Sequence, residues 1–358
     1  GWGETQSKQR TDDRAAEREM KGIHYKLLEP IHELFQGEVF KAEWSGVEGF
    51  VKFVSVCKVR PELSRDSRSV ELLLEDLRKI SKKPVGAVTR VLDAWTDTEG
   101  VAACTEYEAG VTLWELMEKA SSAGVSLPVE SLLSIVLDVA RALETLHEPH
   151  VMVGEIFHGD LRPEHILLSH SGAVKLQGLG YGRFLTAANP AGDWFLWRGR
   201  CYQPRERQRG GAPDARSDVF SLGGVLYEAL TGHPLFSVST DDPAVFVKAA
   251  HSPAPFQRGA RRKEKRSLVG DLRSLIETAC HPDPRHRYTS ISEMAEALRR
   301  GLWERKHPDS SPSLNLKLLK PTASAAGDRE EGGGKVHRET ETAVINEARR
   351  RRQIGRAS

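Results

Sequence analysis

The sequence predicts an α+β fold in which a small antiparallel sheet is followed by a larger helical part, with a cleft between the two layers. Strand-like runs follow one another from Tyr25, as at residues 38–42 and 50–54, and glycines mark the turn between them. Beyond about residue 107, apolar residues recur at helical spacing, as at residues 132–146. Strands that precede helices in this way are typical of α+β proteins.

One helix interrupts the predicted sheet. Its apolar positions are Val70, Leu73, Leu74 and Leu77, and the following Pro84 ends it. After this helix, the apolar run at residues 101–104 predicts a further strand.

Composition divides the chain into four parts. Residues 1–22 are polar and charged, which predicts a flexible lead. Residues 23–107 carry the strand signals and residues 108–303 the helix signals. Residues 304–358 are rich in Ser, Pro, Lys and Gly, a linker composition, and we expect a flexible basic tail.

Length, charge and cysteine content exclude several classes of protein. The chain has 358 residues, of which 39% are hydrophobic, enough for a large core. Its net charge of +2, from 52 basic and 50 acidic residues, indicates no specific nucleic-acid partner. The four cysteines stand singly, which fits neither a zinc site nor a disulfide framework and favours the cytoplasm. No apolar run is long enough for a transmembrane segment.

The segment from Arg349 to Arg352 consists of four consecutive arginines. Two interpretations stay open for it: a solvated tail, or a docking segment for an acidic surface or anionic lipid.

Four motifs in order carry a resemblance to a known family. Residues 158–168 read His-Gly-Asp-Leu-Arg-Pro-Glu-His-Ile-Leu-Leu and are similar to the catalytic loop of protein kinases. Residues 216–232, residues 283–289 and the segment around Glu206 are similar to later motifs of that family. The chain therefore resembles a bacterial-type Ser/Thr protein kinase over about residues 25–303. The resemblance implies a bilobal fold, with a five-stranded antiparallel sheet and one helix in the N-lobe and a mainly helical C-lobe.

The resemblance also shows where the sequence departs from the family. Kinases hold magnesium with an Asn of the catalytic loop and the Asp of a D-F-G motif. These positions fall on His165 and Gly178, and neither offers the oxygen ligand that magnesium prefers. We therefore expect no metal and no cofactor, with ATP and magnesium bound only if the chain is an active kinase.

The nucleotide cleft has changed as well. The glycine-rich loop keeps only its third glycine, Gly37, followed by Val39. Thr105, Glu106 and Tyr107, at the end of the N-lobe, are assigned to the same cleft together with Glu71. All of these residues are candidates for a degenerate nucleotide cleft.

Matching the V-A-I-K strand of the family to Gly49-Phe50-Val51-Lys52 puts Phe50 over the adenine site and Lys52 beside the phosphates. A benzyl group where the family has a methyl group is expected to fill the adenine site. We expect Lys52 to form an ion pair with a glutamate of the predicted helix. Glu71 is preferred and Glu75 is the alternative.

Some residues of the family pattern are retained. Asp160 stands at the position of the catalytic base, and Arg162 keeps the charge of a phosphate-contacting lysine. The expected scaffold residues are His158 and Leu179 as links between the lobes, Asp218 as a brace below the catalytic loop, and Glu206 with Arg287 as a partly buried ion pair.

Three functional hypotheses follow. The leading one is a pseudokinase that binds protein partners as a regulator or scaffold. The second is a weak or atypical Ser/Thr kinase that uses Asp160, Lys52 and Arg162. The third is a sensor that binds a ligand other than magnesium ATP in the remnant cleft.

Overall fold

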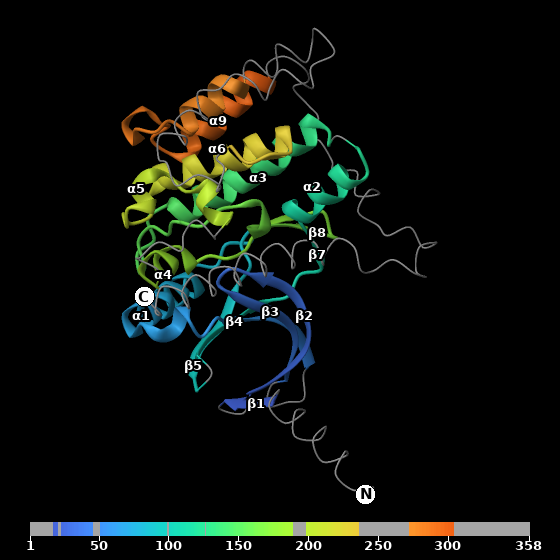
Figure 1. The fold of residues 1–358 in the computed structure, drawn as a ribbon, viewed down its shortest axis with the longest axis vertical. Coiled ribbons are helices and arrows are strands. Elements are labelled where there is room, and N and C mark those ends of the chain that lie inside the picture. The colour runs from blue at the N-terminus through green and yellow to red at the C-terminus, as the bar shows by residue number, and fades with distance from the viewer. Residues whose placement is uncertain are drawn as a thin grey trace, which may run out of the picture.

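The computed structural model describes residues 17–20, 23–45, 51–98, 100–125, 127–188, 198–235 and 272–303. They form two lobes, with the curved sheet in one and most of the helices in the other (Figure 1). The predicted α+β class and the two-lobed arrangement are confirmed. The arginine run from Arg349 lies outside the described residues. No helix among the described residues is long and apolar enough to cross a membrane.

The N-lobe sheet is antiparallel throughout, with the strand order β1-β2-β3-β4-β6-β5. Its strands are β1 (Glu17–Met20), β2 (Ile23–Leu34), β3 (Gly37–Ser45), β4 (Val51–Val59), β5 (Val91–Asp97) and β6 (Gly100–Glu106). Strands β2 to β6 are the five that the family resemblance implies.

Strand β1 is an addition at the edge of the sheet. The flexible lead predicted for residues 1–22 is wrong for residues 17–20, which pair with residues 23–26 of β2. Edge pairing needs only backbone hydrogen bonds, so a short charged segment can form a strand without the apolar alternation that would reveal it.

Helix α1 (Ser67–Ser81) interrupts the sheet as predicted. Asp66 caps its N-terminus, and the Asp66 carboxylate accepts a hydrogen bond from the Ser69 amide at 2.8 Å. Leu73, Leu77 and Ile80 are buried on its inner face, at the spacing that places apolar side chains on one side of a helix.

The two faces of the sheet have different roles, because successive side chains on a strand point to opposite sides. On β4, Val54 and Val56 are buried in a small separate core with Tyr25 and Trp95, whose rings stack at 5.1 Å. The intervening Ser55 and the next residue, Cys57, line the cleft between the lobes.

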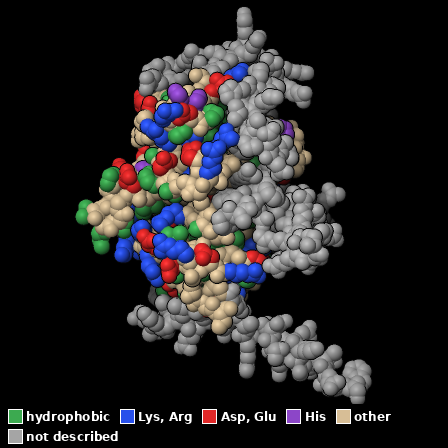
Figure 2. Space-filling view, turned by 60° about the vertical axis from the view of Figure 1, so that its left-hand side comes forward, with side chains coloured by type: hydrophobic (Ala, Val, Ile, Leu, Met, Phe, Trp, Pro, Cys, Tyr) green, Lys and Arg blue, Asp and Glu red, His purple; other side chains and the backbone are tan. Residues whose placement is uncertain are grey.

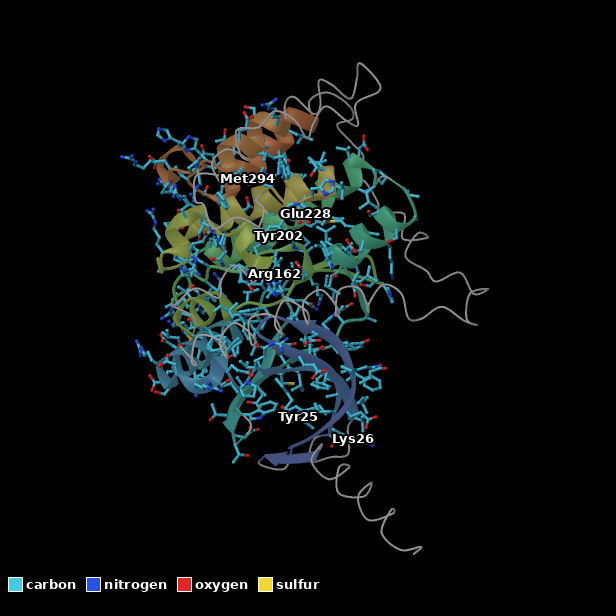
Figure 3. The ribbon with its side chains drawn as sticks, in the orientation of Figure 1. Tyr25, Lys26, Arg162, Tyr202, Glu228 and Met294 are labelled. Atoms are coloured by element: carbon cyan, nitrogen blue, oxygen red, sulfur yellow. The ribbon has the colours of Figure 1, made fainter. Side chains whose placement is uncertain are left out.

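The C-lobe is built around two helices. Helix α3 (Val129–His147) buries its apolar stripe, and α6 (Ala215–Thr231) is buried from Ser217 to Glu228. The other C-lobe elements are β7 (Gly110–Thr112), α2 (Leu113–Ser122), β8 (Ile166–Ser169), β9 (Val174–Leu176), α4 (Tyr181–Ala188), α5 (Arg205–Gln208), a helical segment at 272–279 and α9 (Ile291–Trp303). In the middle of this lobe the Tyr202 hydroxyl donates a hydrogen bond to the Glu228 carboxylate (Figure 3).

A buried lysine connects the lobes on the side of α1. The ammonium group of Lys83 donates hydrogen bonds to the carbonyl oxygens of Leu146 at 2.9 Å and Glu148 at 2.5 Å. These carbonyls end α3, where a positive charge also interacts favourably with the helix dipole. The contact ties the turn after α1 to the C-lobe.

Candidate functional site

The cleft between the lobes holds a cavity of about 1340 Å³. Of the predicted cleft residues, Val39, Thr105 and Tyr107 line it. Gly37 lies in the sheet itself, where a Cβ atom would collide with the backbone oxygen of Lys58. A glycine is therefore required at position 37 by the close approach of β4, whatever the cleft contains.

The predicted ion pair of Lys52 is wrong. The Lys52 side chain is 50% exposed, and its nearest carboxylate is Glu106, with an N–O distance of 3.9 Å. Glu71 forms an exposed pair with Arg68 on its own helix, and Glu75 likewise pairs within α1. Lys52 lies near the start of β4 and contributes nothing to the lining of the cavity.

The structure places the V-A-I-K pattern five residues later in β4. Ser55 and Cys57 line the cavity with the Ala-x-Lys spacing, so a hydroxymethyl group takes the roof position and a thiol takes the place of the lysine. Burial raises the pKa of Cys57 to about 11, so the thiol is neutral. The predicted roof residue, Phe50, lies outside the described residues.

The catalytic-loop segment is held from below by Asp218, as predicted. The backbone N–H groups of His158 and Gly159 donate to its carboxylate at 2.8 and 2.9 Å, and the His147 ring lies 2.9 Å away. Burial raises the pKa of Asp218, but the hydrogen bond and charge of His147 outweigh burial, so the net pKa lies below the usual value. Asp218 is therefore an ionised brace.

Asp160, at the position of the catalytic base, is buried. Its carboxylate lies 3.6 Å from both Arg162 Nε and His165 Nδ1 and makes no hydrogen bond within the described part of the chain. Burial raises the pKa of Asp160 to about 7, and the Arg162 charge opposes this effect. The group is therefore partly protonated near neutral pH.

His165 and Gly178, at the two metal-ligand positions, lie against each other. His165 Nδ1 donates to the backbone oxygen of Asp160 at 2.7 Å, and Nε2 accepts from Arg162 at 3.3 Å. Burial and the Arg162 charge lower the pKa of His165 well below its usual value, so the ring is neutral. A Cβ atom on Gly178 would lie 2.8 Å from three atoms of this ring. The imidazole occupies the space that an aspartate at position 178 would need.

The remnant of the glycine-rich loop is the tight turn between β2 and β3, and it is tied to the catalytic loop. The buried Gln36 accepts a hydrogen bond from Arg162 Nη2 at 3.2 Å. Arg60 holds the turn from the other side, donating to the Phe35 oxygen at 2.9 Å and to Glu33 at 3.0 Å. In the side-chain view, Arg162 lies at the junction of the sheet and the helices (Figure 3). A glutamine thus bridges the space where the family cradles phosphates.

His158 stacks on the His165 ring at 5.7 Å and contacts the Gln177 oxygen at 2.9 Å. Both partners belong to the C-lobe, so the link between the lobes stays a prediction for His158. Leu179 is buried at the cavity wall. Glu206 and Arg287 form a bidentate pair at 2.5 and 3.2 Å.

Sequence reasoning missed the roles of Gln36 and Arg207. Arg207 is buried and donates to the Gly182 oxygen at 3.0 Å and the Thr186 hydroxyl at 3.2 Å, which joins α5 to α4. Both are polar residues whose partners are far away in the sequence, and no local pattern announces such contacts. For Ser55 and Cys57 a signal existed: Val54-Ser55-Val56-Cys57 keeps the two β-branched positions of Val-Ala-Ile-Lys, with a small serine for the alanine and a cysteine for the lysine.

The cleft thus places a neutral thiol and a neutral imidazole, those of Cys57 and His165, among its lining residues. No group of three potential His, Cys, Asp or Glu ligands occurs among the residues that the structure describes.

Comparison with known proteins agrees with this architecture. The sequence profile of the protein kinase domain matches residues 36–300. A probable serine/threonine-protein kinase of Clostridium perfringens is 28% identical over 76% of this chain and 37% of its own length. Tyrosine-protein kinase MasK of Myxococcus xanthus is 25% identical over 82% of this chain and 45% of its own length. Serine/threonine-protein kinase PknB of Mycobacterium tuberculosis is 33% identical over 54% of this chain and 29% of its own length.

The chain therefore spans less than half the length of these relatives. Among solved structures, the kinase domain of Mycobacterium tuberculosis PknI matches with a TM-score of 0.60 and 20% identity, over 80% of this chain and 98% of that one. At this identity the likeness concerns the fold alone.

Proposed function

Since the chain belongs to the protein kinase family, we propose that it is a pseudokinase, which keeps the kinase fold as a surface for protein partners and does not transfer phosphate. One observation carries the proposal: the His165 ring fills the space over Gly178. Both metal-ligand positions therefore lack an oxygen ligand. An aspartate could not be introduced at position 178 while the ring of His165 occupies this space. Phosphoryl transfer depends on metal ions and positioned charge.

Two further features support the proposal. Cys57 provides a neutral thiol where an ammonium group would contact phosphates. Gln36 spans the phosphate site and is bonded to Arg162, so a triphosphate would have to break this contact before it could bind.

In contrast, the contacts that stabilise the fold are intact. The brace at Asp218 and the ion pair of Glu206 with Arg287 hold the catalytic loop and the segment around Glu206 in place. A rigid kinase-shaped surface without metal ligands is what a regulator or scaffold requires. We expect the partner to be a protein and the compartment to be the cytoplasm.

The test combines binding and catalysis. Calorimetric titration with ATP, with and without magnesium, is expected to show no gain in affinity from the metal. Incubation with radiolabelled ATP is expected to leave the protein and a generic substrate protein unlabelled. Labelling that Asp160→Asn abolishes would overturn the proposal and favour a weak Ser/Thr kinase. Labelling that persists in Asp160→Asn would indicate a contaminating kinase, and the assay would then be repeated on repurified protein until the two preparations agree.

A further inference from the structure

The turn that follows α3 presents two apolar side chains to solvent. Val151 is 103% exposed and Met152 is 73% exposed, the two highest values among the large hydrophobic residues that the structure describes. Turn positions usually carry Gly, Asn, Asp, Ser or Pro, because these residues suit the backbone of a turn. The turn itself therefore does not explain a valine followed by a methionine at this place.

Hydrogen bonds hold this turn, residues 150–154, in one shape. The His150 N–H donates to the Gly154 oxygen at 3.1 Å, and the Gly154 N–H donates to the His150 oxygen at 2.8 Å. The Met152 N–H donates to the His150 ring at 3.3 Å, and Val153 packs against the C-lobe core. The two apolar side chains are thus held in their outward position, which lowers the entropy cost of covering them with a partner.

Two carboxylates flank the 150–154 turn. Glu148 precedes it, Glu155 follows it, and both are exposed. The buried Lys83 ammonium lies within electrostatic reach of both, but its hydrogen bonds go to carbonyl oxygens. Figure 2 shows a group of hydrophobic side chains that projects in this way at its left edge, with acidic side chains beside it. A complementary partner therefore combines apolar side chains with positive charge.

The chain itself contains a segment of this chemistry, at residues 343–356, outside the described residues. Its aliphatic residues are Val344, Ile345 and Ile354. Its positive charge comes mainly from the four consecutive arginines that begin at Arg349. The sequence analysis left the partner of these arginines open.

The length of the chain allows the segment to reach the turn. Helix α9, which ends at Trp303, packs against α3. The 19 residues of α3 span about 28 Å at 1.5 Å per residue, and the 150–154 turn follows its end. With the linker composition noted in the sequence, the stretch from Trp303 to Arg349 spans about 35–40 Å. The turn therefore lies within the range of the segment.

We propose that residues 343–356 dock on the 150–154 turn of the same chain, so that aliphatic side chains cover Val151 and Met152 and arginines pair with Glu148 and Glu155. The residues of this turn do not line the cavity between the lobes, so the proposal does not depend on the proposed function. An anionic lipid surface is a poor alternative occupant of the turn, because the two flanking carboxylates would repel it.

The first test measures binding of a fluorescein-labelled peptide of residues 343–356 by fluorescence anisotropy. The whole chain is used with Arg349→Gln, Arg350→Gln, Arg351→Gln and Arg352→Gln, so that its own segment competes poorly. The peptide is expected to bind this variant at least tenfold more tightly than the unchanged chain, because a tethered segment has an effective concentration in the millimolar range. No binding to the variant, or equal binding to both chains, would overturn the proposal.

Exposed apolar residues are then exchanged in the glutamine variant. Val151→Ser with Met152→Ser is expected to weaken peptide binding at least tenfold, because two apolar contacts are lost. Val125→Ser with Leu28→Ser changes two other exposed residues and should leave the affinity unchanged. If both pairs have the same effect, the peptide does not recognise the turn and the proposal is wrong.

Charge is tested in the same way. Glu148→Gln with Glu155→Gln is expected to weaken peptide binding about three- to tenfold, the effect of two exposed ion pairs. Glu130→Gln with Glu277→Gln removes two exposed carboxylates elsewhere and should have no effect. An equal loss in both pairs would mean that the peptide responds only to net charge, against the proposal.

A lipid partner for the arginines is the competing outcome. The unchanged chain and the glutamine variant are each mixed with phosphatidylserine vesicles and sedimented. Because the arginines are expected to be occupied by the turn, both chains should bind the vesicles equally weakly. Vesicle binding that needs the arginines in the unchanged chain would show that the segment is not docked, and would refute the proposal while leaving the pseudokinase untouched.

Discussion

Replacing Gly178 with alanine adds a single methyl group against the His165 ring. The new Cβ would lie 2.8 Å from three ring atoms, and the backbone at this position has a φ of +73°. A non-glycine residue in this region costs about 1–2 kcal/mol, and overpacking a buried site costs about 1–3 kcal/mol. We expect Gly178→Ala to lower the free energy of unfolding by about 2–5 kcal/mol.

A matched glycine separates the two effects. Gly154 has a φ of +70°, and a Cβ atom there would meet nothing within 4 Å. Gly154→Ala should therefore cost only the backbone strain, about 1–2 kcal/mol. The difference between the two variants, about 1–3 kcal/mol, measures the collision with the ring. Urea unfolding followed by circular dichroism supplies all of these values.

A double-mutant cycle identifies the ring as the cause. His165→Ala removes the imidazole, so adding Gly178→Ala to it should cost about 1–3 kcal/mol less than in the parent chain. The reasoning is refuted if Gly178→Ala is no more damaging than Gly154→Ala, or if the two substitutions at 165 and 178 are additive.

Three further predictions follow from buried charges. Arg287→Ala leaves Glu206 without its partner and should lower stability by about 3 kcal/mol, with Glu206→Gln milder because that side chain is 34% exposed; urea midpoints measure both. The raised pKa of Asp160, about 7, makes the folded state bind its proton more tightly than the unfolded state does, so stability should fall as pH rises from about 4 to 7. Asp160→Asn should remove this dependence of stability on pH. Thermal melting at a series of pH values measures it, and a melting temperature that changes equally with pH in both chains would contradict the assignment. Lys83→Met loses two hydrogen bonds to the end of α3 and should lower stability by about 1–3 kcal/mol, seen as faster amide exchange at residues 146–148.

The sequence by itself determined the fold class, the family and the scaffold. Periodicity separates strands from helices because it reflects which side chains are buried, and the start of α1 follows from its capping residue Asp66. The motifs around Asp160, Asp218 and Glu206 were readable because each keeps several neighbours in fixed spacing. The loss of oxygen ligands at His165 and Gly178 needed only counting along the chain.

Only the tertiary structure decided which residues face the cleft. A lysine in a strand-like run suggested Lys52, yet the pairing of Val39 with Cys57 places the cleft side of β4 five residues later. Register is a property of pairing between strands, and a shift along one strand changes which side chains meet the cavity. The contact of Gln36 with Arg162 joins residues 126 positions apart, and the collision at Gly178 depends on where an imidazole lies in space. Contacts of this kind arise from packing between distant segments, and for that reason no local pattern encodes them.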